Sequence, residues 1–268
     1  MKLTIISKTA QEAGSIELPE QFNEPVRPDL IRKAVLAIKS NSRQPYGASP
    51  EAGKRASAIL SKRRRAYRGC YGYGISRTPR KILSRRGRRM NWTGAIAPNT
   101  VGGRRAHAPK AQKIWNKKVN IKERRKAIRS AISATVNKEF LESSGADIPD
   151  NYPFVIENGF ESISKTKQAK DALEKIGLKE KLQKSGKRKV RAGKGKLRGR
   201  KYKTRRCALI VVSSSCKIME SAKNIQGIDV VEVKDLNAER LSLGTTPGRI
   251  TLFTQRAIEQ MEKEKMFM

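Results

Sequence analysis

Hydrophobic and polar positions follow two different periods in the first 42 residues, which predicts a pair of strands and then a helix. Residues 2–6 and 15–18 alternate with a period of two around Ala13-Gly14, a pattern typical of a small β-hairpin. Pro28 and Asp29 suit the first turn of a helix, because proline lacks only an amide that has no partner there and an acid complements the helix dipole. The apolar residues that follow recur at helical spacing and stop near Asn41: Leu30, Ile31, Ala34, Val35 and Ile38.

From residue 119 onward, helical patterns alternate with short apolar runs. Asn120 with Glu123 three residues later predicts a capping box for a helix whose buried stripe holds Ile121, Ile128, Ile132, Thr135 and Val136. Arg124 falls on the same stripe, so one end of this helix is expected to face something other than core. Strands are predicted at 154–156, 208–212, 230–233 and 250–253, and helices at 166–176 (ended by Gly177), 216–224, from 237, and 255–265. Apolar strands that alternate with helices indicate an α/β fold with a predominantly parallel sheet flanked by helices.

Charge is concentrated in two segments that lack these periods. Residues 43–118 hold 21 basic residues and one acid, Glu51, and residues 181–206 hold 14 basic residues and no acid. The other 166 residues carry 25 basic and 23 acidic side chains. We therefore expect a globular α/β domain of residues 1–42 and 119–268, a long extended loop at 43–118 inserted in it, and a second basic loop at 181–206. Polycationic segments on a nearly neutral body predict tight, salt-dependent binding of a polyanion.

Arginine clusters in these segments are the candidate phosphate contacts, because a guanidinium clamps phosphate oxygens in a bidentate manner. Aromatic residues between them, with Tyr71, Tyr73 and Trp92 as the candidates, are typical of stacking on unpaired bases. The predicted contacts are Arg63, Arg64, Arg65, Arg68, Arg77, Arg80, Lys81, Arg85, Arg86, Arg88, Arg89, Arg104, Arg105, Lys110, Arg124, Arg125, Arg188, Arg191, Arg198 and Arg200. The alternative for both segments is a solvated, disordered tail; their position between well-patterned elements argues against it.

Residues suited to catalysis or to holding a cofactor are few. His107 is the only histidine, so a histidine metal site or a Ser-His-Asp triad has almost no residues to draw on, and its basic, proline-containing segment favours an RNA contact or solvent exposure over general-base work. The glycines at 69, 72 and 74 do not follow a predicted strand or open a helix, as a dinucleotide-binding loop requires, and Gly193-Lys-Gly195 misses the P-loop pattern. Glu157, Ser213 and Lys234 stand at the ends of predicted strands without evident partners, and Cys216 is expected to be a small buried side chain. No catalytic residue, cofactor or metal is predicted.

The cysteine count and the hydropathy pattern bear on the compartment. Three cysteines without a Cys-x-x-Cys spacing argue against disulfides and for a reducing compartment, and no apolar run is long enough to span a membrane. A cytoplasmic protein is expected.

Six motifs follow one another along the chain: Arg-Pro-Asp-Leu-Ile-Arg-Lys-Ala-Val at 27–35, Arg-Gln-Pro-Tyr-Gly at 43–47, Gly-Lys-Arg-Ala-Ser-Ala at 53–58, Ile-Ser-Arg-Thr-Pro-Arg at 75–80, Val-Gly-Gly-Arg-Arg-Ala-His at 101–107 and Lys-Glu-Arg-Arg-Lys-Ala-Ile-Arg-Ser-Ala-Ile at 122–132. Together, in this order, they resemble the universal large-subunit ribosomal protein four family, in its archaeal and eukaryotic branch. Residues 58–66 depart from the family's usual Glu-Ser-Trp-Gly type of segment, so local rRNA contacts there cannot be carried over. His-Ala-Pro at 107–109 stands where His-Pro-Pro is common.

The resemblance implies a structural, non-enzymatic constituent of the large ribosomal subunit. In that family a globular α/β domain lies on the ribosome surface, and a long loop threads through large-subunit rRNA to the wall of the nascent-peptide exit tunnel. Here the loop would be residues 43–118, with Met90, Asn91 and Trp92 as candidates for its inner tip. The implied partners are large-subunit rRNA, neighbouring ribosomal proteins and, in passing, the nascent peptide; no membrane is implied. The alternatives are a nucleic-acid-processing enzyme with basic guide loops and a protein that condenses nucleic acid generally.

Overall fold

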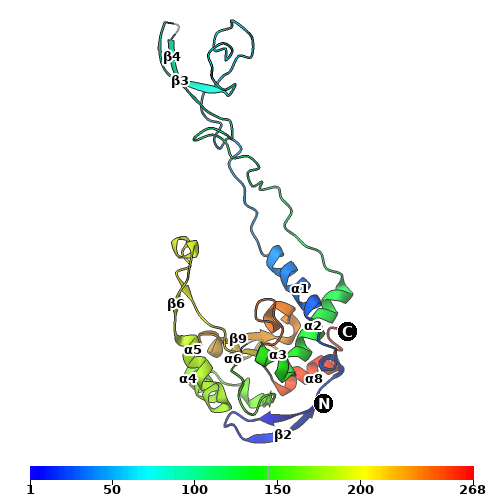
Figure 1. The fold of residues 1–268 in the computed structure, drawn as a ribbon. Helices are drawn as coiled ribbons and strands as arrows, with labels where there is room; N and C mark the ends of the chain where they lie inside the picture. Colours follow the sequence, from blue (N-terminus) through cyan, green and yellow to red (C-terminus); the bar gives the residue numbers. More distant parts are fainter. Residues whose placement is uncertain (88, 144, 146) are drawn as a thin grey trace. The chain divides into compact units, whose positions relative to one another are not determined.

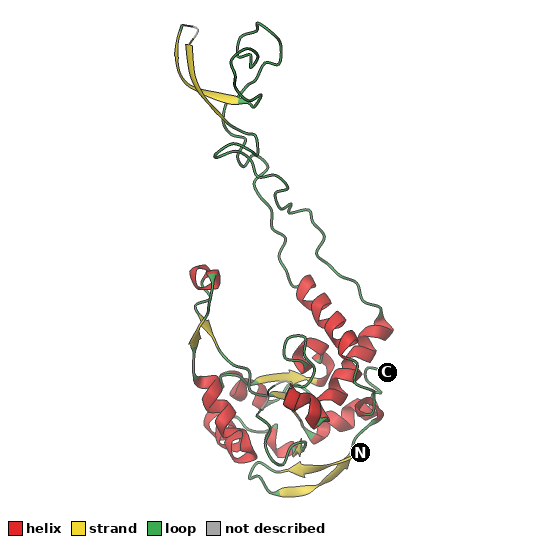
Figure 2. Cartoon of the chain, viewed as in Figure 1, coloured by secondary structure: helices red, strands yellow, loops and turns green. Residues whose placement is uncertain are grey.

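The structure is a computed structural model that describes residues 1–87, 89–143, 145 and 147–268. The chain divides into two compact units, one made of residues 1–41 and 116–268 and the other of residues 42–115. Figure 1 traces both along the sequence, and Figure 2 shows that the helices belong to the first unit.

The first unit begins with the predicted hairpin. Strands β1 (Lys2–Ile6) and β2 (Glu12–Glu17) pair in antiparallel fashion, with Leu3 opposite Ile16. The turn differs from the prediction: it lies at residues 7–11, and Gly14 sits inside β2 opposite Ile5. Strand β1 also pairs in parallel with β5 (Val155–Ile156), so it is the central strand of a small mixed sheet.

A second sheet of three strands is parallel throughout. Its order is β10 (Thr251–Phe253), β8 (Leu209–Val212) and β9 (Asp229–Glu232), and a single parallel bridge between Ile156 and Thr254 links it to β5. The α/β class is therefore confirmed, but the predominantly parallel sheet is not. Among the described residues the sheets are small and mixed: two hold three strands each, one of them partly antiparallel, and two are antiparallel hairpins.

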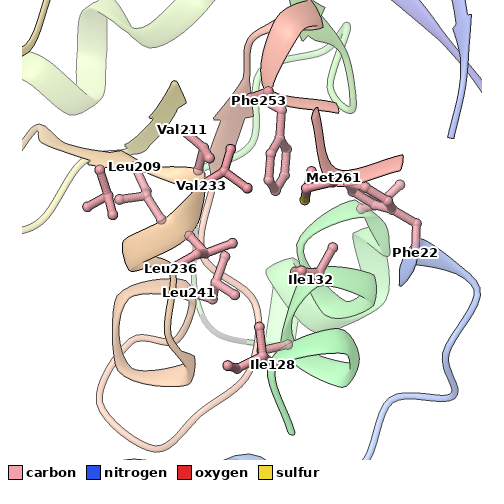
Figure 3. Close-up of a cluster of buried hydrophobic side chains, with 14 of the residues drawn as sticks. Phe22, Ile128, Ile132, Leu209, Val211, Val233, Leu236, Leu241, Phe253 and Met261 are labelled. Atoms are coloured by element: carbon pink, nitrogen blue, oxygen red, sulfur yellow. The ribbon is translucent and has the colours of Figure 1, made fainter. Parts of the chain in front are cut away.

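Both faces of the parallel sheet are covered, because successive side chains of a strand point to opposite faces. Leu209 and Val211 of β8 pack with helix residues such as Ile132 and Met261 in one apolar cluster, drawn in Figure 3. Ile210 and Val212 pack in the other cluster, with residues such as Leu173 and Ile218. The nearly uninterrupted apolar sequence of β8 follows from this two-sided burial.

Two long helices flank the point where the second unit leaves the first. They are α1 (Pro28–Asn41) and α2 (Ile121–Val136), as predicted. Asn120 makes no side-chain cap, however, and Glu123 instead forms an ion pair of 2.7 Å with Lys33 of α1, so the predicted capping box is wrong. Ile121 and Arg124 are both exposed, which places the start of α2 outside the core and removes Ile121 from the predicted buried stripe.

The remaining helices are short. They are α3 (Lys138–Ser143), α4 (Thr166–Leu173), α5 (Lys179–Gly186), α6 (Lys217–Lys223), α7 (Ala238–Leu241) and α8 (Gln255–Lys263). A π-helical turn at Glu174–Leu178 joins α4 to α5, and Gly177 within it adopts a φ of 97° that favours glycine. Helix α3 was not predicted, and α5 occupies the first residues of the predicted loop at 181–206. Among the described residues, no helix has both the length and the apolar character needed to cross a bilayer.

Both basic segments contain strands that the sequence did not reveal. Strands β3 (Arg80–Arg86) and β4 (Arg89–Gly94) form an antiparallel hairpin in the second unit, and β6 (Lys189–Val190) pairs with β7 (Tyr202–Lys203) in the first. The long loop predicted at 43–118 therefore contains a regular hairpin that was not predicted from the sequence. Polar and charged side chains outnumber apolar ones in these strands, so the sequence gives only a weak strand signal there.

Candidate nucleic-acid interface

Apart from Lys184 of α5, which pairs with Asp147 and Glu180, the described cations of both basic segments have no acidic partners inside the protein. No described lysine or arginine in residues 43–118 or 187–206 lies within 4.0 Å of an acidic side chain; the ion pairs of the described residues all fall elsewhere. Lys33, for example, pairs with Glu123, and Arg129 with Glu24. The positive charge of the two segments is therefore not neutralised internally and is available to an anionic partner.

Aromatic rings hold several of these cations in place. Cation–π contacts occur in both basic segments. Arg77 lies over Tyr71 at 5.0 Å and Arg80 over Trp92 at 5.8 Å, distances at which the ring quadrupole attracts a guanidinium. Such contacts orient the side chains without cancelling their charge.

One aromatic cluster joins the two limbs of the segment near its ends. Tyr46 and Trp115 stack at 5.7 Å, with the Arg43 guanidinium 4.0 Å and the Lys113 ammonium 4.4 Å from the centre of the Trp115 ring. The amide of Ala48 donates to the carbonyl of Pro109 at 3.0 Å beside them. We call Arg43, Tyr46, Lys113 and Trp115 the limb clasp. Sequence reasoning missed it, although an aromatic residue flanked by cations at both ends of the segment was a visible signal.

The hairpin of β3 and β4 has one half-buried face. Met90 and Trp92 alternate with exposed residues along β4, and Ile82 of β3 lies opposite Trp92. The Arg85 guanidinium donates to the hydroxyl of Tyr67 at 3.0 Å and also lies over the Tyr67 ring. The hairpin is thus tied to the segment before it by an arginine–tyrosine contact.

Most of the predicted phosphate contacts are exposed. Arg68, Arg80 and Arg191 are half-buried, Arg88 lies outside the described residues, and the others are exposed: Arg63, Arg64, Arg65, Arg77, Lys81, Arg85, Arg86, Arg89, Arg104, Arg105, Lys110, Arg124, Arg125, Arg188, Arg198 and Arg200. Arg125 donates to the carbonyl of Met268 at 2.6 Å, so its guanidinium is partly engaged within the protein.

The aromatic candidates differ in exposure. Tyr71 and Tyr73 are exposed, Trp92 is half-buried, and of the predicted tip residues only Asn91 is exposed, Met90 being half-buried with Trp92.

The second basic segment forms a small hairpin that leaves α5 (Figure 1). The Arg191 guanidinium, directly after β6, donates from Nε to the carbonyl of Arg200, shortly before β7, at 3.1 Å. Arg188 and Lys201 lie over the ring of Tyr202 at 6.0 and 5.6 Å. Tyr202 was not among the predicted stacking residues.

A buried carboxylate lies at the carboxyl ends of β8 and β10. Glu161 accepts hydrogen bonds from the amide and hydroxyl of Ser213 at 3.3 Å and from the hydroxyl of Thr254 at 2.7 Å. The expectation that Ser213 lacks a partner is therefore wrong. Because both hydroxyls donate to the carboxylate, this arrangement ties the strand ends together.

The thiols and the histidine give no reactive group. Burial raises the pKa of Cys207 to about 11, and burial followed by the charge of Glu161 raises the pKa of the half-buried Cys216, so both favour the unreactive thiol. His107 is exposed, and no three metal-ligating side chains gather within the described ranges.

The fold and the charge distribution define a class of protein: an α/β domain that carries acid-poor, polycationic segments within its chain.

Comparison with known proteins indicates one family within this class. The sequence model of the ribosomal protein L4/L1 family matches residues 16–264. The large ribosomal subunit protein uL4 of Nanoarchaeum equitans is 45% identical over 268 residues, which is all of both chains. Those of Methanopyrus kandleri (40% over 268 residues, 98% of each chain) and Archaeoglobus fulgidus (39% over 262 residues, 97% of this chain and 98% of the relative) are also similar.

The chain belongs to the ribosomal protein L4/L1 family. The resemblance drawn from the six motifs is thereby confirmed, including the archaeal character of the relatives. Members of this family are structural proteins, so the chain is not an enzyme.

Proposed function

We propose that the chain is a constituent of the large ribosomal subunit in the cytoplasm and binds the rRNA of that subunit. In this proposal the globular domain of residues 1–42 and 119–268 docks on folded rRNA, and the loops at 43–118 and 181–206 enter between rRNA helices. One observation carries it: Glu51 is the one acidic residue of the two segments, and the described cations of residues 43–118 and 187–206 form no ion pair, whereas Lys184 within α5 pairs with Asp147.

The physical argument is electrostatic. A segment with about twenty unpaired cations repels itself in isolation, and this repulsion is relieved when each cation meets a phosphate and releases a condensed counterion. The full-length similarity to proteins named for the large ribosomal subunit supports ribosomal rRNA as that polyanion, rather than DNA or an unrelated RNA.

The proposal extends to the wall of the nascent-peptide exit tunnel. In it, Met90, Asn91 and Trp92 lie near the tunnel lumen, with the nascent peptide as a passing partner and neighbouring ribosomal proteins around the globular domain. Residues 88–96 include β4, whose strand partner β3 lies in the same unit, so their deletion spares the core of the first unit. The deletion variant is expected to enter the large subunit with an altered tunnel, as judged by cryo-electron microscopy of the isolated subunit. Failure to enter the subunit would instead make the hairpin an anchor.

Sedimentation of the tagged protein from cell lysate on sucrose gradients tests the main proposal. We expect the protein to travel with the large subunit at both low and high salt, because cations enclosed by rRNA are screened less than exposed ones. Release to the top of the gradient at high salt would show a peripheral binder and overturn the tunnel assignment. Migration with bulk DNA would favour a general condensing protein.

A further inference from the structure

A cavity of about 480 Å³ lies beside the β3–β4 hairpin, wholly within the second unit. Its walls include Arg68, Tyr73, Ile75, Arg89, Met90 and Trp92. This volume falls in the range of sites that hold small organic ligands.

Two separate stretches of chain build the cavity. The half-buried face of β4 supplies Met90 and Trp92, because residues two apart in a strand share a face. The opposite wall comes from residues 68–75, where Arg68 adopts a φ of +59°. A non-glycine residue in this left-handed region is strained, so the contacts around Arg68 hold it there at a cost.

The lining combines two kinds of chemistry. Tyr73 and Trp92 offer aromatic faces, and Ile75 and Met90 offer apolar surface, so a flat ring would be bound by stacking and by burial. Arg68 and Arg89 supply guanidinium groups, and no acidic residue lines the cavity. The Arg68 Nε is buried and has no hydrogen-bond partner among the described residues, so it carries the desolvation penalty of an unsatisfied donor. A ligand that brings a hydrogen-bond acceptor would offset this penalty.

We propose that this cavity holds a single nucleotide of the large-subunit rRNA, extruded from its stack. The base lies against Tyr73 and Trp92, and the phosphate lies near Arg68 and Arg89. A nucleotide matches both halves of the lining, since it joins an aromatic ring to an anion. An aromatic side chain of a passing peptide carries no negative charge, so it would leave both guanidinium groups without a counter-charge. This inference rests on the proposed function, because it presumes that the loop lies within rRNA.

Trp92 provides a direct reporter of binding. In the full-length Trp115→Phe variant it is the only tryptophan, and the ring at the limb clasp is kept. Adenosine 5′-monophosphate is expected to quench its fluorescence saturably at high salt, while ribose 5-phosphate does not, because only the former can stack. Equal effects of the two probes would overturn the proposal. Tighter binding of N-acetylphenylalaninamide would overturn it in favour of a peptide site.

Tyr73 lines the cavity and Tyr71, two positions earlier, does not, so the two tyrosines give a matched pair of variants. Tyr73→Ala is expected to weaken the binding of adenosine 5′-monophosphate about tenfold, which corresponds to the loss of one stacking contact. Tyr71→Ala should leave binding unchanged, because Tyr71 is exposed under Arg77 and does not line the cavity. Equal weakening by both variants would argue for a general loss of loop structure and against the cavity.

Chemical probing of assembled subunits separates rRNA from a free nucleotide as the source of the base. Large subunits that contain the Tyr73→Ala protein are expected to show one base with increased reactivity to dimethyl sulfate or a carbodiimide, relative to subunits with the wild-type or Tyr71→Ala protein. If the variants enter subunits and no base changes, the rRNA inference fails while the proposed function stands. If no form of the protein enters subunits, the proposed function itself fails.

Discussion

At the scale of single residues, a buried arginine secures the edge of the parallel sheet. The side chain of Arg249 is fully buried just before β10, and its guanidinium donates to the Asp229 carboxylate at 2.6 Å. It also donates to the carbonyls of Ala208 and Arg240 at 3.2 and 2.9 Å. Burial lowers the pKa of Arg249, and the hydrogen bond to Asp229 opposes that shift. The pair thus joins β9 to the segments that precede β8 and β10.

Replacement of Asp229 tests how much this pair contributes. Asp229→Asn is expected to lower the free energy of unfolding by about 2 kcal/mol, because a buried guanidinium loses its counter-charge. The value lies below that for a fully enclosed pair, since the Asp229 side chain is 32% exposed. Urea denaturation of the full chain measures the change. Asp29→Asn is the control: the Asp29–Arg27 pair has the same 2.6 Å separation but is exposed, so a comparable loss would contradict this account.

Cys207 gives a pH dependence at the alkaline side. Burial is the main cause of its raised pKa of about 11, against an ordinary value near 9, and the charges of Lys181 and Arg249 oppose it. Because the folded value lies above the unfolded one, its contribution to stability is complete below pH 9 and is lost as pH rises toward 11. Wild-type protein should therefore lose more stability between pH 9 and pH 11 than Cys207→Ala, as measured by urea unfolding across that range. Parallel curves for the two proteins would show that the thiol is not shielded.

At the scale of elements, a turn of the second unit requires glycine, because the backbone passes too close there for a Cβ atom. Residues 96–104 form a tight turn in which the amide of Arg104 donates to the carbonyl of Ile96 at 3.1 Å, and that of Gly103 to Thr100 at the same distance. A Cβ on Gly103 would clash with the carbonyl oxygen of Ala97, so any larger residue would force the turn open. The arginines that follow depend on this turn for their direction.

Gly103→Ala should therefore loosen the turn. Trypsin is expected to cut after Arg104 and Arg105 severalfold faster in this variant, because an opened turn exposes the backbone, and mass spectrometry of timed digests measures the rate. Gly102→Ala is the neighbouring control: its φ of +73° strains a side chain, but nothing lies within 4 Å of the added Cβ. Cleavage at the same rate in both variants would mean that the close approach to Ala97 does not hold the turn.

At the scale of the whole molecule, segregation of charge governs binding. The ion pairs of the described residues lie within the first unit, such as those of Glu24 with Arg129 and Lys126. Beyond α5, the described cations of the basic segments have aromatic rings or uncharged oxygens as partners, but no acidic side chain. The salt dependence of rRNA binding should therefore come from the segments and hardly at all from the globular body.

Paired neutralisation separates these contributions. The proposed main contacts in the loop are Arg77, Arg80, Arg85, Arg86, Arg88, Arg89, Arg104 and Arg105. A double Arg104→Gln, Arg105→Gln variant is expected to reduce the slope of log affinity against log salt by about one for each contact, measured on a large-subunit rRNA fragment. Lys33→Gln with Lys126→Gln removes the same charge from cations that already face acids, so the slope should hardly change. An unchanged slope in the arginine variant would remove Arg104 and Arg105 from the interface.

Hydropathy and charge along the sequence were enough to place several elements of the fold and to locate the basic segments. The two-sided burial of β8 makes its sequence apolar throughout, and the stripe of α1 marks its buried face, so periodicity was enough to place both. Composition was also enough to separate the nearly neutral body from the basic segments, because charge is additive and needs no structure. Asn120 shows where prediction from neighbouring residues fails. Glu123 forms an ion pair with Lys33 of α1, a helix far away in sequence, instead of completing the predicted capping box.

Only the tertiary structure decided what the basic segments build. Strands β3 and β4 carry mainly polar side chains, so their pairing follows from backbone hydrogen bonds and from a few contacts such as that of Arg85 with Tyr67, none of which leaves a hydropathy period. The limb clasp joins residues about seventy positions apart, and the cavity brings Tyr73 to Trp92 from separate stretches. Sequence reveals which chemistry a segment holds, but long-range pairing determines which of those side chains meet, because chain folding sets distances that sequence separation does not.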